Sequence, residues 1–456
     1  MLIESFSGIR GVYNSELTPD IVKKYAYAYF DSFLKKNSNG LIKIAIGRDG
    51  RKSGEEIFNL FCEILDCEIL DLGVASTPIV ENAVRNFCCD GGIIITASHN
   101  EPEYNGFKFL RKDGAILNPE EIKKVIEKFN EIKDDDLSFE INNQFVENYH
   151  YSALGSYIGF MRDILGDVNL NGIKILVDPN GGAGVFSKIV FDEFGVEAVY
   201  VNMNAGEFNR IVEPNLDSLN YLSDKIINEN VDFAVGFDCD ADRVEILLNN
   251  GQLISGNEIL AITVDDVLSK DFKSPVVVND ATSYLIKDIA NKYNCDFIEV
   301  EVGETNIVNK MSEVKSLVGG EGSNGGVIVG NSKCRDGILG ILYLLKILKE
   351  KGKRLNDLIK DLPKYYYFKE KVELDKDFEL VSSDLIKYYS DKGFEIKRTG
   401  GDNGGLKFVD KDGSWVWFRQ SKTESNVLRI ISDSKDEEVA NGLIKEAKRL
   451  LNVNIS

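Results

Sequence analysis

The sequence has little of several features that common protein classes need. Its seven cysteines are scattered and form no C-x-x-C pair, which fits free thiols in a reducing cytoplasm better than a disulfide framework. No apolar run approaches the about eighteen residues that span a membrane. Met1-Leu2-Ile3-Glu4 lacks the basic start and apolar core of a signal peptide. We therefore expect a cytoplasmic protein without a membrane partner.

Positive charge is also scarce. The chain holds 54 lysines and arginines against 74 aspartates and glutamates, which gives a formal net charge of −20. This balance argues against a nucleic-acid partner, because such binding rests on cations that meet phosphates. A small anionic substrate needs only a local basic pocket and stays open. The 456 residues, of which 43% are hydrophobic, are enough for three or four ordinary globular domains.

An order of strands and helices occurs three times along the chain, and each copy ends in a conspicuous loop. This alternation predicts three α/β units with mostly parallel, covered sheets. Because ligands bind beyond the carboxyl ends of strands in open α/β sheets, we expect the three loops to face one cleft. A more strand-rich part with one closing helix, residues 436–451, follows. The predicted strands of the three copies are residues 41–46, 67–72 and 93–95; 173–177, 197–201 and 231–237; and 275–279, 295–302 and 316–318.

Ser98 lies in the first of these loops, in the stretch Thr96-Ala97-Ser98-His99-Asn100, directly after a predicted strand. A serine exposed at the end of a buried strand can act as a nucleophile or carry a phosphoryl group. His99 is badly placed as its base, because neighbours on an extended chain point to opposite faces. No G-x-S-x-G elbow surrounds Ser98, and the only other histidine is His150. Taken alone, the stretch is equally a structural turn.

Asp238, Asp240 and Asp242 alternate along the second loop, directly after an apolar strand. Three carboxylates so close together repel one another unless a cation neutralises them, and oxygen ligands suit Mg²⁺ or Ca²⁺. An EF-hand is excluded, because Arg243 and Asn249 stand where that loop needs glycine and glutamate. A solvated acidic turn is the alternative.

Two further stretches carry residues suited to a sugar phosphate. Residues 419–426, with Arg429 beyond them, combine arginines with hydroxyl side chains, which suit a phosphate cradle. Glu321 and Ser323 lie on the third, glycine-rich loop, where they can bond sugar hydroxyls. Each stretch alone is equally an exposed turn.

Together these loops resemble those of the α-D-phosphohexomutase family, which includes phosphoglucomutases, phosphomannomutases and phosphoglucosamine mutases. The resemblance spans essentially the whole chain and keeps the family's order. The stretches that carry it are Gly8-Ile9-Arg10-Gly11, Gly47-Arg48-Asp49, residues 96–100 with 104–108, residues 238–243, residues 320–323 and residues 419–425.

The resemblance implies three similar mixed-sheet α/β domains and a smaller C-terminal α+β domain around a central cleft. Its boundaries would be 1–147, 148–255, 256–367 and 368–456, which carry in turn the phosphoserine, metal-binding, sugar-binding and phosphate-binding loops. It also implies an isomerase that interconverts hexose 1-phosphate and hexose 6-phosphate of glucose or mannose, with Mg²⁺ and hexose 1,6-bisphosphate. The implied roles are metal binding by Asp238, Asp240, Asp242 and Ser98, catalysis by Ser98, Arg10, Lys108 and His99, and substrate binding by Glu321, Ser323, Arg243, Arg419, Ser421, Thr423 and Arg429.

The chain departs from the family pattern in three loops. Glu101 stands where proline commonly follows the asparagine, and Asn324-Gly325-Gly326 stands where many members have a histidine. Lys422 and Ser425 replace a glycine and a proline of the phosphate-binding loop. These changes put a sugar contact and a phosphate contact in question.

Three alternatives to a glucose or mannose mutase stay open. A phosphoglucosamine mutase differs only in the substituent at C2 of the sugar. A Mg²⁺-dependent sugar phosphatase would also use an Asp-x-Asp loop after a strand, although the third aspartate and Ser98 argue against it. A non-catalytic sugar-phosphate binder would explain the altered loops. The sequence leaves a homodimer open, because the aromatic face predicted for the helix at residues 20–36 could lie in an interface, although the pattern favours a core.

Overall fold

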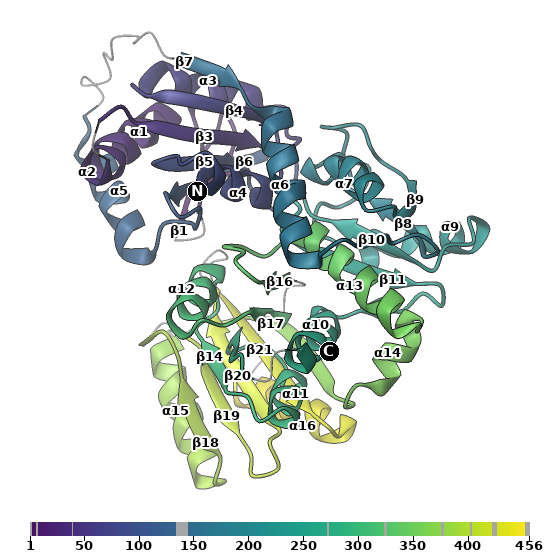
Figure 1. Ribbon diagram of the computed structural model, residues 1–456. Helices are drawn as coiled ribbons and strands as arrows, with labels where there is room; N and C mark the ends of the chain where they lie inside the picture. Colours follow the sequence, from purple (N-terminus) through teal and green to yellow (C-terminus); the bar gives the residue numbers. More distant parts are fainter. Residues whose placement is uncertain are drawn as a thin grey trace. The chain divides into compact units, whose positions relative to one another are not determined.

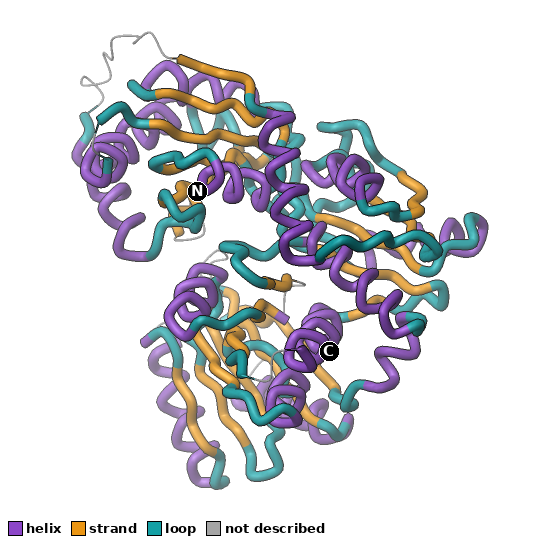
Figure 2. The backbone as a smooth tube through the Cα atoms, viewed as in Figure 1, coloured by secondary structure: helices purple, strands orange, loops and turns teal. Residues whose placement is uncertain are grey.

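A computed structural model describes residues 2–5, 8–38, 40–133, 145–270, 273–322, 326–374, 378–401, 404–421 and 426–451 (Figures 1 and 2). The chain divides into two compact units. The first unit comprises Met1–Ile254 with Ile328–Gly352, and the second comprises Ser255–Val327 with Lys353–Ser456. Among the described residues, none of the helices combines the length and apolarity that crossing a membrane requires.

The first unit begins with a seven-stranded mixed sheet in the order β1-β2-β6-β5-β3-β4-β7. Helices cover this sheet, and α1 begins at Pro19 behind its capping residue Thr18. The strands are β1 (Ile3–Ser5), β2 (Gly8–Val12), β3 (Lys43–Arg48), β4 (Glu68–Val74), β5 (Gly91–Ile95), β6 (Tyr104–Arg111) and β7 (Phe145–Asn148). The helices are α1 (Pro19–Tyr29), α2 (Lys35–Asn37), α3 (Gly54–Ile64), α4 (Thr77–Asn86), α5 (Pro119–Glu131) and α6 (His150–Leu165).

Aromatic side chains of the first helix fill the core beneath this sheet. Tyr25 stacks on Phe129, and Tyr29 stacks on Phe109 of β6. Both tyrosines are fully buried. The structure thus shows that the aromatic face of residues 20–36 packs in the core. The segment continues beyond α1 as a π-helical turn, Phe30–Leu34, before α2.

A five-stranded sheet follows in the first unit, in the order β12-β11-β10-β8-β9. Its strands are β8 (Lys174–Asp178), β9 (Glu197–Tyr200), β10 (Phe233–Phe237), β11 (Val244–Leu248) and β12 (Leu253–Ile254). The helices of this part are α7 (Ser187–Glu193), α8 (Leu216–Leu219), α9 (Ser223–Asn228) and α13 (Gly337–Lys351).

The second unit contains a five-stranded antiparallel sheet and a four-stranded sheet, whose strand β16 begins in this unit and ends at Val329 of the first. The four-stranded sheet has the order β14-β13-β15-β16, with β13 (Val276–Asn279), β14 (Phe297–Val300), β15 (Val318–Glu321) and β16 (Gly326–Val329). The antiparallel sheet has the order β17-β21-β20-β19-β18, with β17 (Tyr366–Glu373), β18 (Glu395–Arg398), β19 (Leu406–Val409), β20 (Trp415–Gln420) and β21 (Val427–Ser434). The helices are α10 (Gly256–Lys270), α11 (Leu285–Lys292), α12 (Glu304–Val314), α14 (Leu355–Asp361), α15 (Phe378–Asp391) and α16 (Glu437–Leu450).

The threefold repeat predicted from the sequence is confirmed by the strand orders. The series β6-β5-β3-β4, β11-β10-β8-β9 and β16-β15-β13-β14 place equivalent strands at equivalent positions. In each series the third strand of the copy lies between its first and its fourth. The predicted fold class, three mixed α/β sheets and a C-terminal α+β part, is therefore confirmed, whereas the domain boundaries and the central cleft stay predictions.

Two details of the sequence-based expectation were wrong. The third strand of the last copy was predicted to end at Val318, but β15 continues through two glycines to Glu321. The C-terminal part was predicted to hold one helix, but α15 precedes the predicted helix α16. Glycine favours turns in a sequence pattern, yet Gly319 belongs in a strand because a Cβ there would lie 2.4 Å from the Val277 carbonyl oxygen.

Candidate active site

Ser98 lies in a turn directly after β5, in a stretch that we call the Ser98 loop, residues 96–104. Its φ is 51°, which places a non-glycine residue in the left-handed region. Such strain costs ~1–3 kcal/mol and clusters at functional sites. The Thr96 hydroxyl supports it by accepting from the Ser98 amide at 2.8 Å. Ser98 is buried rather than exposed as the sequence suggested.

The Ser98 hydroxyl donates to Asp238 Oδ2 at 3.1 Å. Asp238, Asp240 and Asp242 follow β10, and one carboxylate oxygen of each lies within 4.8 Å of the others. All three aspartates are fully buried. The second carboxylate oxygens of Asp240 and Asp242, the Oδ1 atoms, have no hydrogen-bond partner among the described residues. Buried oxygens without donors, set beside a hydroxyl, fit a hard divalent cation such as Mg²⁺.

Lysine and arginine side chains hold the other oxygens of this triad. Lys108 Nζ lies 2.8 Å from Asp240 Oδ2 and 3.7 Å from Asp242 Oδ2. Arg335 Nη2 lies 2.7 Å from Asp242 Oδ2. Arg243 Nε is 3.9 Å from Asp238 Oδ2 and 3.8 Å from Asp242 Oδ1, and the Arg243 amide donates to Asp238 Oδ1 at 3.2 Å. Lys108 and Arg335 thus orient Asp240 and Asp242 through Oδ2, while their Oδ1 atoms accept no hydrogen bond from the described residues.

Arg10 and Lys108 reach the site from two adjacent antiparallel strands, β2 and β6. Arg10 lies opposite Gly106 in the register, and its Nη1 donates to Asn100 Oδ1 at 3.4 Å. A Cβ at Gly106 would lie 2.1 Å from the Ile9 carbonyl oxygen, so glycine is required for β6 to approach β2. This close approach explains the glycine in the sequence Asn105-Gly106.

Burial and charge set the protonation of these groups. Burial raises the pKa of Asp238 well above its ordinary value, and the charges of Asp242 and Asp240 raise it further. Burial acts in the same direction on Asp240 and Asp242, but nearby donors outweigh it. Lys108 and the Thr77 hydroxyl lower the pKa of Asp240, and Arg335, Lys108 and Arg243 lower that of Asp242. A bound cation would offset the repulsion that raises the pKa of Asp238. Burial and the charge of Arg243 lower the pKa of Arg10 to about 10, so Arg10 stays a cation at pH 7.

His99 is buried beside the same cations. The charge of Arg243, burial and the charge of Arg10 lower the pKa of His99 well below its ordinary value. The imidazole is therefore neutral at pH 7, and its Nδ1 has no hydrogen-bond partner among the described residues. Ser98 donates to Asp238 instead of to His99, which agrees with the sequence-based argument against a Ser-His pair.

Two residues that the sequence analysis missed also contact the triad. Thr77 donates its hydroxyl to Asp240 Oδ2 at 2.6 Å and its amide to the Asp240 carbonyl at 3.0 Å. It is the first residue of α4, whose cap is Ser76. Arg335 precedes α13, whose cap Asp336 accepts from Tyr157 at 2.7 Å. The helix-start patterns Ser76-Thr77-Pro78 and Arg335-Asp336-Gly337 are signals that could have indicated both.

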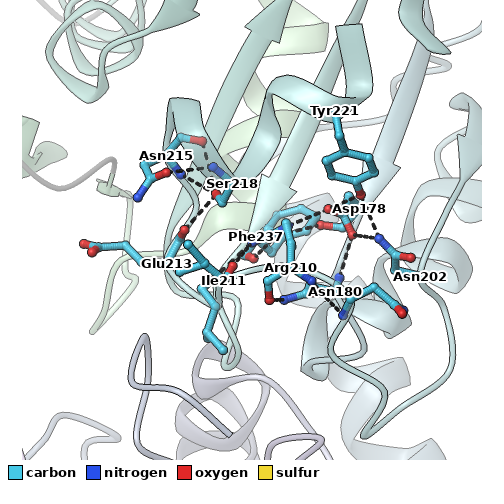
Figure 3. A network of polar contacts seen from close by, with 12 residues as sticks. Asp178, Asn180, Asn202, Arg210, Ile211, Glu213, Asn215, Ser218, Tyr221 and Phe237 are labelled. Atoms are coloured by element: carbon cyan, nitrogen blue, oxygen red, sulfur yellow. Dashed lines mark hydrogen bonds and ion pairs between the residues drawn. The ribbon is translucent and has the colours of Figure 1, made fainter. Parts of the chain in front are cut away.

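A polar network supports the loop of residues 238–242 from the end of β8 (Figure 3). Arg210, Asn202 and Tyr221 point toward the buried carboxylate of Asp178 (Figure 3). Arg210 Nε lies 2.6 Å from Asp178 Oδ2, and Arg210 Nη2 donates to the Phe237 carbonyl at 2.7 Å. Phe237 is the last residue of β10 and precedes Asp238. Arg210 therefore fixes the backbone from which the triad begins.

The second unit holds the residues predicted to bind sugar and phosphate. Glu321 ends β15, and its Oε1 accepts from Asn279 Nδ2 at 3.1 Å and from the Gly303 amide at 3.0 Å. Arg419 on β20 lies opposite Arg429 on β21, and Arg419 Nη2 is 3.2 Å from Glu301 Oε1. The Ser421 amide donates to the Val427 carbonyl at 2.7 Å. Ser323, Asn324, Gly325, Lys422, Thr423 and Ser425 lie outside the described residues.

The unusual Glu101 has a defined place. Its Oε1 accepts from the Val212 amide at 3.4 Å, so the side chain links the Ser98 loop to the segment that carries Arg210.

The predicted residues that the structure describes form two groups, each within one unit. Ser98, the three aspartates, Arg10, Lys108, His99 and Arg243 belong to the first unit, and Glu321, Arg419, Ser421 and Arg429 belong to the second.

Comparison with known proteins places the chain in a family. Residues 3–136 match the model of phosphoglucomutase/phosphomannomutase α/β/α domain I, and residues 255–366 match that of domain III. A phosphoglucomutase/phosphomannomutase of Thermococcus kodakarensis is 33% identical over 97% of both chains. A phosphoglucosamine/phosphogalactosamine mutase of Sulfurisphaera tokodaii is 30% identical over 97% of this chain and 98% of its own.

A solved structure agrees with this placement at the level of the fold. A phosphoglucomutase/phosphomannomutase family protein from Burkholderia thailandensis has a TM-score of 0.82 at 22% identity, over 98% of this chain and 96% of its own. The chain therefore belongs to the phosphoglucomutase/phosphomannomutase family, the α-D-phosphohexomutases.

Proposed function

We propose that the protein interconverts hexose 1-phosphate and hexose 6-phosphate of glucose or mannose, through phosphorylated Ser98 and a hexose 1,6-bisphosphate. One observation carries the proposal. The Ser98 hydroxyl donates a hydrogen bond to Asp238, one of three buried aspartates. The Oδ1 atoms of the other two accept no hydrogen bond from the described residues, and cationic side chains lie near all three. A phosphoryl group on Ser98 would then meet both a metal site and the positive charges that its transfer requires.

Phosphoryl transfer needs mainly positioning and electrostatic stabilisation. Phosphoserine 98 would give its phosphoryl group to the free hydroxyl of the hexose phosphate; the bond from phosphorus to the Ser98 oxygen breaks, and the proton of that hydroxyl ends on the Ser98 oxygen. The bisphosphate would turn, its other phosphoryl group would return to the Ser98 oxygen, and the Ser98 proton would end on the sugar oxygen, which releases the isomer. Bound at Asp238, Asp240 and Asp242, Mg²⁺ would neutralise charge on the transferring group.

The chain's own cations would stabilise the transferring group. Arg10 stays charged at pH 7 and lies beside the Ser98 loop through Asn100. Lys108 is held between two carboxylates, and Arg243 adjoins both ends of the triad. His99, neutral and buried, would hydrogen-bond without adding charge.

The second unit would recognise the rest of the substrate. Glu321 has a carboxylate oriented by Asn279 and Gly303, which suits binding to sugar hydroxyls. Arg419 and Arg429 lie opposite each other on adjacent strands and would hold the phosphate that does not react. We propose the same roles for Ser323, Ser421 and Thr423 from the family resemblance.

Phosphoglucosamine is a second candidate substrate, because a relative that is 30% identical is named as a phosphoglucosamine/phosphogalactosamine mutase. The kcat/KM values on glucose 1-phosphate, mannose 1-phosphate and glucosamine 1-phosphate would separate the two. A hundredfold preference for the amino sugar would replace glucose and mannose in the proposal.

Intact-mass spectrometry of the wild type and of Ser98→Ala tests the mechanism. We expect the wild type, but not the variant, to gain one phosphoryl group from hexose 1,6-bisphosphate and Mg²⁺, and peptide mapping to locate it at Ser98. An unmodified Ser98 would contradict the mutase. Phosphate release as fast as isomer formation would then favour a phosphatase, and tight binding without turnover a binder. Further predictions are the four domain boundaries, the central cleft, a homodimer and a cytoplasmic location. Light scattering tests the homodimer.

A further inference from the structure

Arg51 makes an unusual set of contacts with the Ser98 loop. Its guanidinium donates to four backbone carbonyls of that loop, at distances of 2.5–3.0 Å. The acceptors are the carbonyl oxygens of Ser98, Asn100, Glu101 and Tyr104. A guanidinium has five N–H groups, and the fifth, Nε–H, donates to Asp49 Oδ2 at 3.1 Å. Every donor of this side chain is therefore used.

Arg51 is itself held firmly. Its side chain and that of Asp49 have no exposed surface. Asp49 Oδ1 accepts from the Arg51 amide at 2.9 Å, and the Asp49 amide donates to the Ile95 carbonyl at 3.0 Å. Ile95 is the last residue of β5, from which the Ser98 loop starts. The arginine thus braces the loop against the strand that carries it.

The Ser98 loop has few other backbone supports. Within the loop, the Asn100 amide donates to the Ala97 carbonyl at 3.1 Å and the Tyr104 amide to the Glu101 carbonyl at 3.0 Å. At its two ends, the Thr96 amide donates to the Gly106 carbonyl at 2.9 Å and the Glu103 carbonyl accepts from the Tyr13 amide at 3.0 Å. The loop belongs to no helix before β6 begins at Tyr104. It also holds Ser98 at a positive φ. A conformation of this kind persists only where its surroundings over-determine it, and Arg51 supplies four of the constraints.

We propose that Arg51 is a positioning residue for phosphoryl transfer. It fixes the backbone of the Ser98 loop and through it the Ser98 hydroxyl, 3.1 Å from Asp238 Oδ2. Its catalytic part rests on the proposed function, whereas its effect on the loop does not. A lysine keeps the charge at this position but has three donors on one atom, so it cannot bond four carbonyls.

Arg51→Lys is the variant that tests the proposal, and Arg48→Lys is its matched control. Arg48 lies three residues earlier, pairs with Asp71 at 2.8 Å and with Glu55, and does not contact the Ser98 loop through these bonds. For each protein we would measure kcat and KM for glucose 1-phosphate with Mg²⁺ and the rate at which Ser98 is phosphorylated by glucose 1,6-bisphosphate. Hydrogen exchange of a peptide that spans the Ser98 loop would be followed in the absence of any sugar.

We expect Arg51→Lys to lower kcat and the rate of Ser98 phosphorylation by about 100-fold, the effect of a small misplacement of a reacting group. KM should stay within about threefold, and exchange in the Ser98 loop should become about tenfold faster. Arg48→Lys should leave all of these values near those of the wild type. If Arg51→Lys retains kcat within about twofold, or if exchange of the loop is unchanged, Arg51 has no such role.

The exchange readout separates this proposal from the proposed function. A wild type that neither isomerises hexose phosphates nor accepts a phosphoryl group on Ser98 would refute the mutase and the catalytic part. Exchange in Arg51→Lys would still decide whether the arginine fixes the loop. Should Arg51→Lys not fold, Asp49→Asn provides the second test, because it weakens the hold on Nε and should raise loop exchange in the same peptide.

Discussion

The loops after β5 and β10 can be compared with Glu321, the last residue of β15, because the three strands occupy equivalent places in their sheets. In these two loops, each functional side chain already has a partner of opposite charge or a braced backbone. Asp240 meets Lys108, Asp242 meets Arg335, and the backbones are held by Arg51 and Arg210. At the end of β15, the Asn279 side-chain amide and the Gly303 backbone amide both donate to Glu321 Oε1.

This difference follows from what each loop would have to do. Charges that stabilise a transferring phosphoryl group work best when they are fixed beforehand, because no reorganisation is then needed during the reaction. A loop that binds a sugar in two orientations needs acceptors that serve either face of the ring. Substitutions in the first unit should therefore lower kcat, whereas those at Glu321 and Arg419 should raise KM.

The largest effect should come from Ser98→Ala. This variant removes the oxygen that would carry the phosphoryl group, so we expect kcat to fall by ~10³-fold or more with little change in stability. A coupled isomerase assay measures the loss. Ser383→Ala, at a surface serine of α15, is the control and should keep full activity. A Ser98→Ala enzyme within tenfold of the wild type would remove the basis of the comparison.

Asp240→Asn should come next. The amide keeps the shape but removes one charge from the triad, and it leaves Lys108 without its 2.8 Å partner. We expect binding of Mg²⁺ to weaken by about 10- to 100-fold and kcat to fall by about 100-fold. Calorimetric titration with Mg²⁺ measures the first value. Asp266→Asn, at a buried aspartate that pairs with Lys270 on α10, should leave Mg²⁺ binding unchanged.

Glu321→Gln tests the other side of the comparison. The amide retains an acceptor for Asn279 and the Gly303 amide but loses the charge offered to sugar hydroxyls. We expect KM for the hexose phosphate to rise by about 10- to 100-fold, with a smaller change in kcat. Glu258→Gln in the same unit, at the cap of α10, is the control. A loss confined to kcat would show that Glu321 acts like a residue of the first unit.

Arg210→Lys sharpens the contrast between the two loops of the first unit. Lysine can still pair with Asp178 but cannot also reach the Phe237 carbonyl through a fork of donors. Partners behind metal ligands typically change affinity by 10- to 100-fold, so we expect Mg²⁺ binding to weaken by about tenfold. Phosphorylation of Ser98 at saturating Mg²⁺ should be nearly normal, in contrast to Arg51→Lys. An unchanged Mg²⁺ titration would leave Arg210 a purely structural residue.

The same difference explains how much of the molecule the sequence could predict. Apolar strands that each end in a polar loop and alternate with helices predicted the three α/β copies. Helices that cover a sheet bury its strands, and this burial produces the pattern. The strand β15 was predicted too short, since glycines that are needed for close approach look like a turn. Helix α15 was missed between strands of the C-terminal part. Neither case is visible without the neighbours that pack against these segments.

The candidate site divides in the same way. Ser98 and the three aspartates are evident because reactive or repelling groups stand directly after buried strands. The contacts of Arg51, Thr77, Arg210 and Arg335 are not evident, even where a helix-start pattern marks the residue, because each contacts atoms far away in the sequence. Arg210, for example, reaches a carbonyl 27 positions further on, and Arg335 reaches a carboxylate 93 positions earlier. Only the folded chain brings these groups together.

The smallest effect concerns a buried carboxylate of the second unit that accepts hydrogen bonds from neutral donors. Asp433 accepts from the Ser283 hydroxyl at 2.7 Å and the Tyr284 amide at 2.8 Å, and burial raises its pKa to about 7. Because this value exceeds that of the unfolded chain, about 3.9, the native state binds the proton more tightly between pH 4 and 7. The contribution of Asp433 to the free energy of unfolding is therefore lost as pH rises through this range, by up to ~4 kcal/mol.

Asp433→Asn is neutral and can bond the same partners. The Tm of this variant should therefore rise by a few degrees relative to that of the wild type as pH increases from 4 to 7. Thermal scans at several pH values measure this difference, and Asp384→Asn, at an exposed position on α15, should show none. A Tm difference that does not vary with pH would mean that Asp433 is ionised throughout, like the paired aspartates of the first unit.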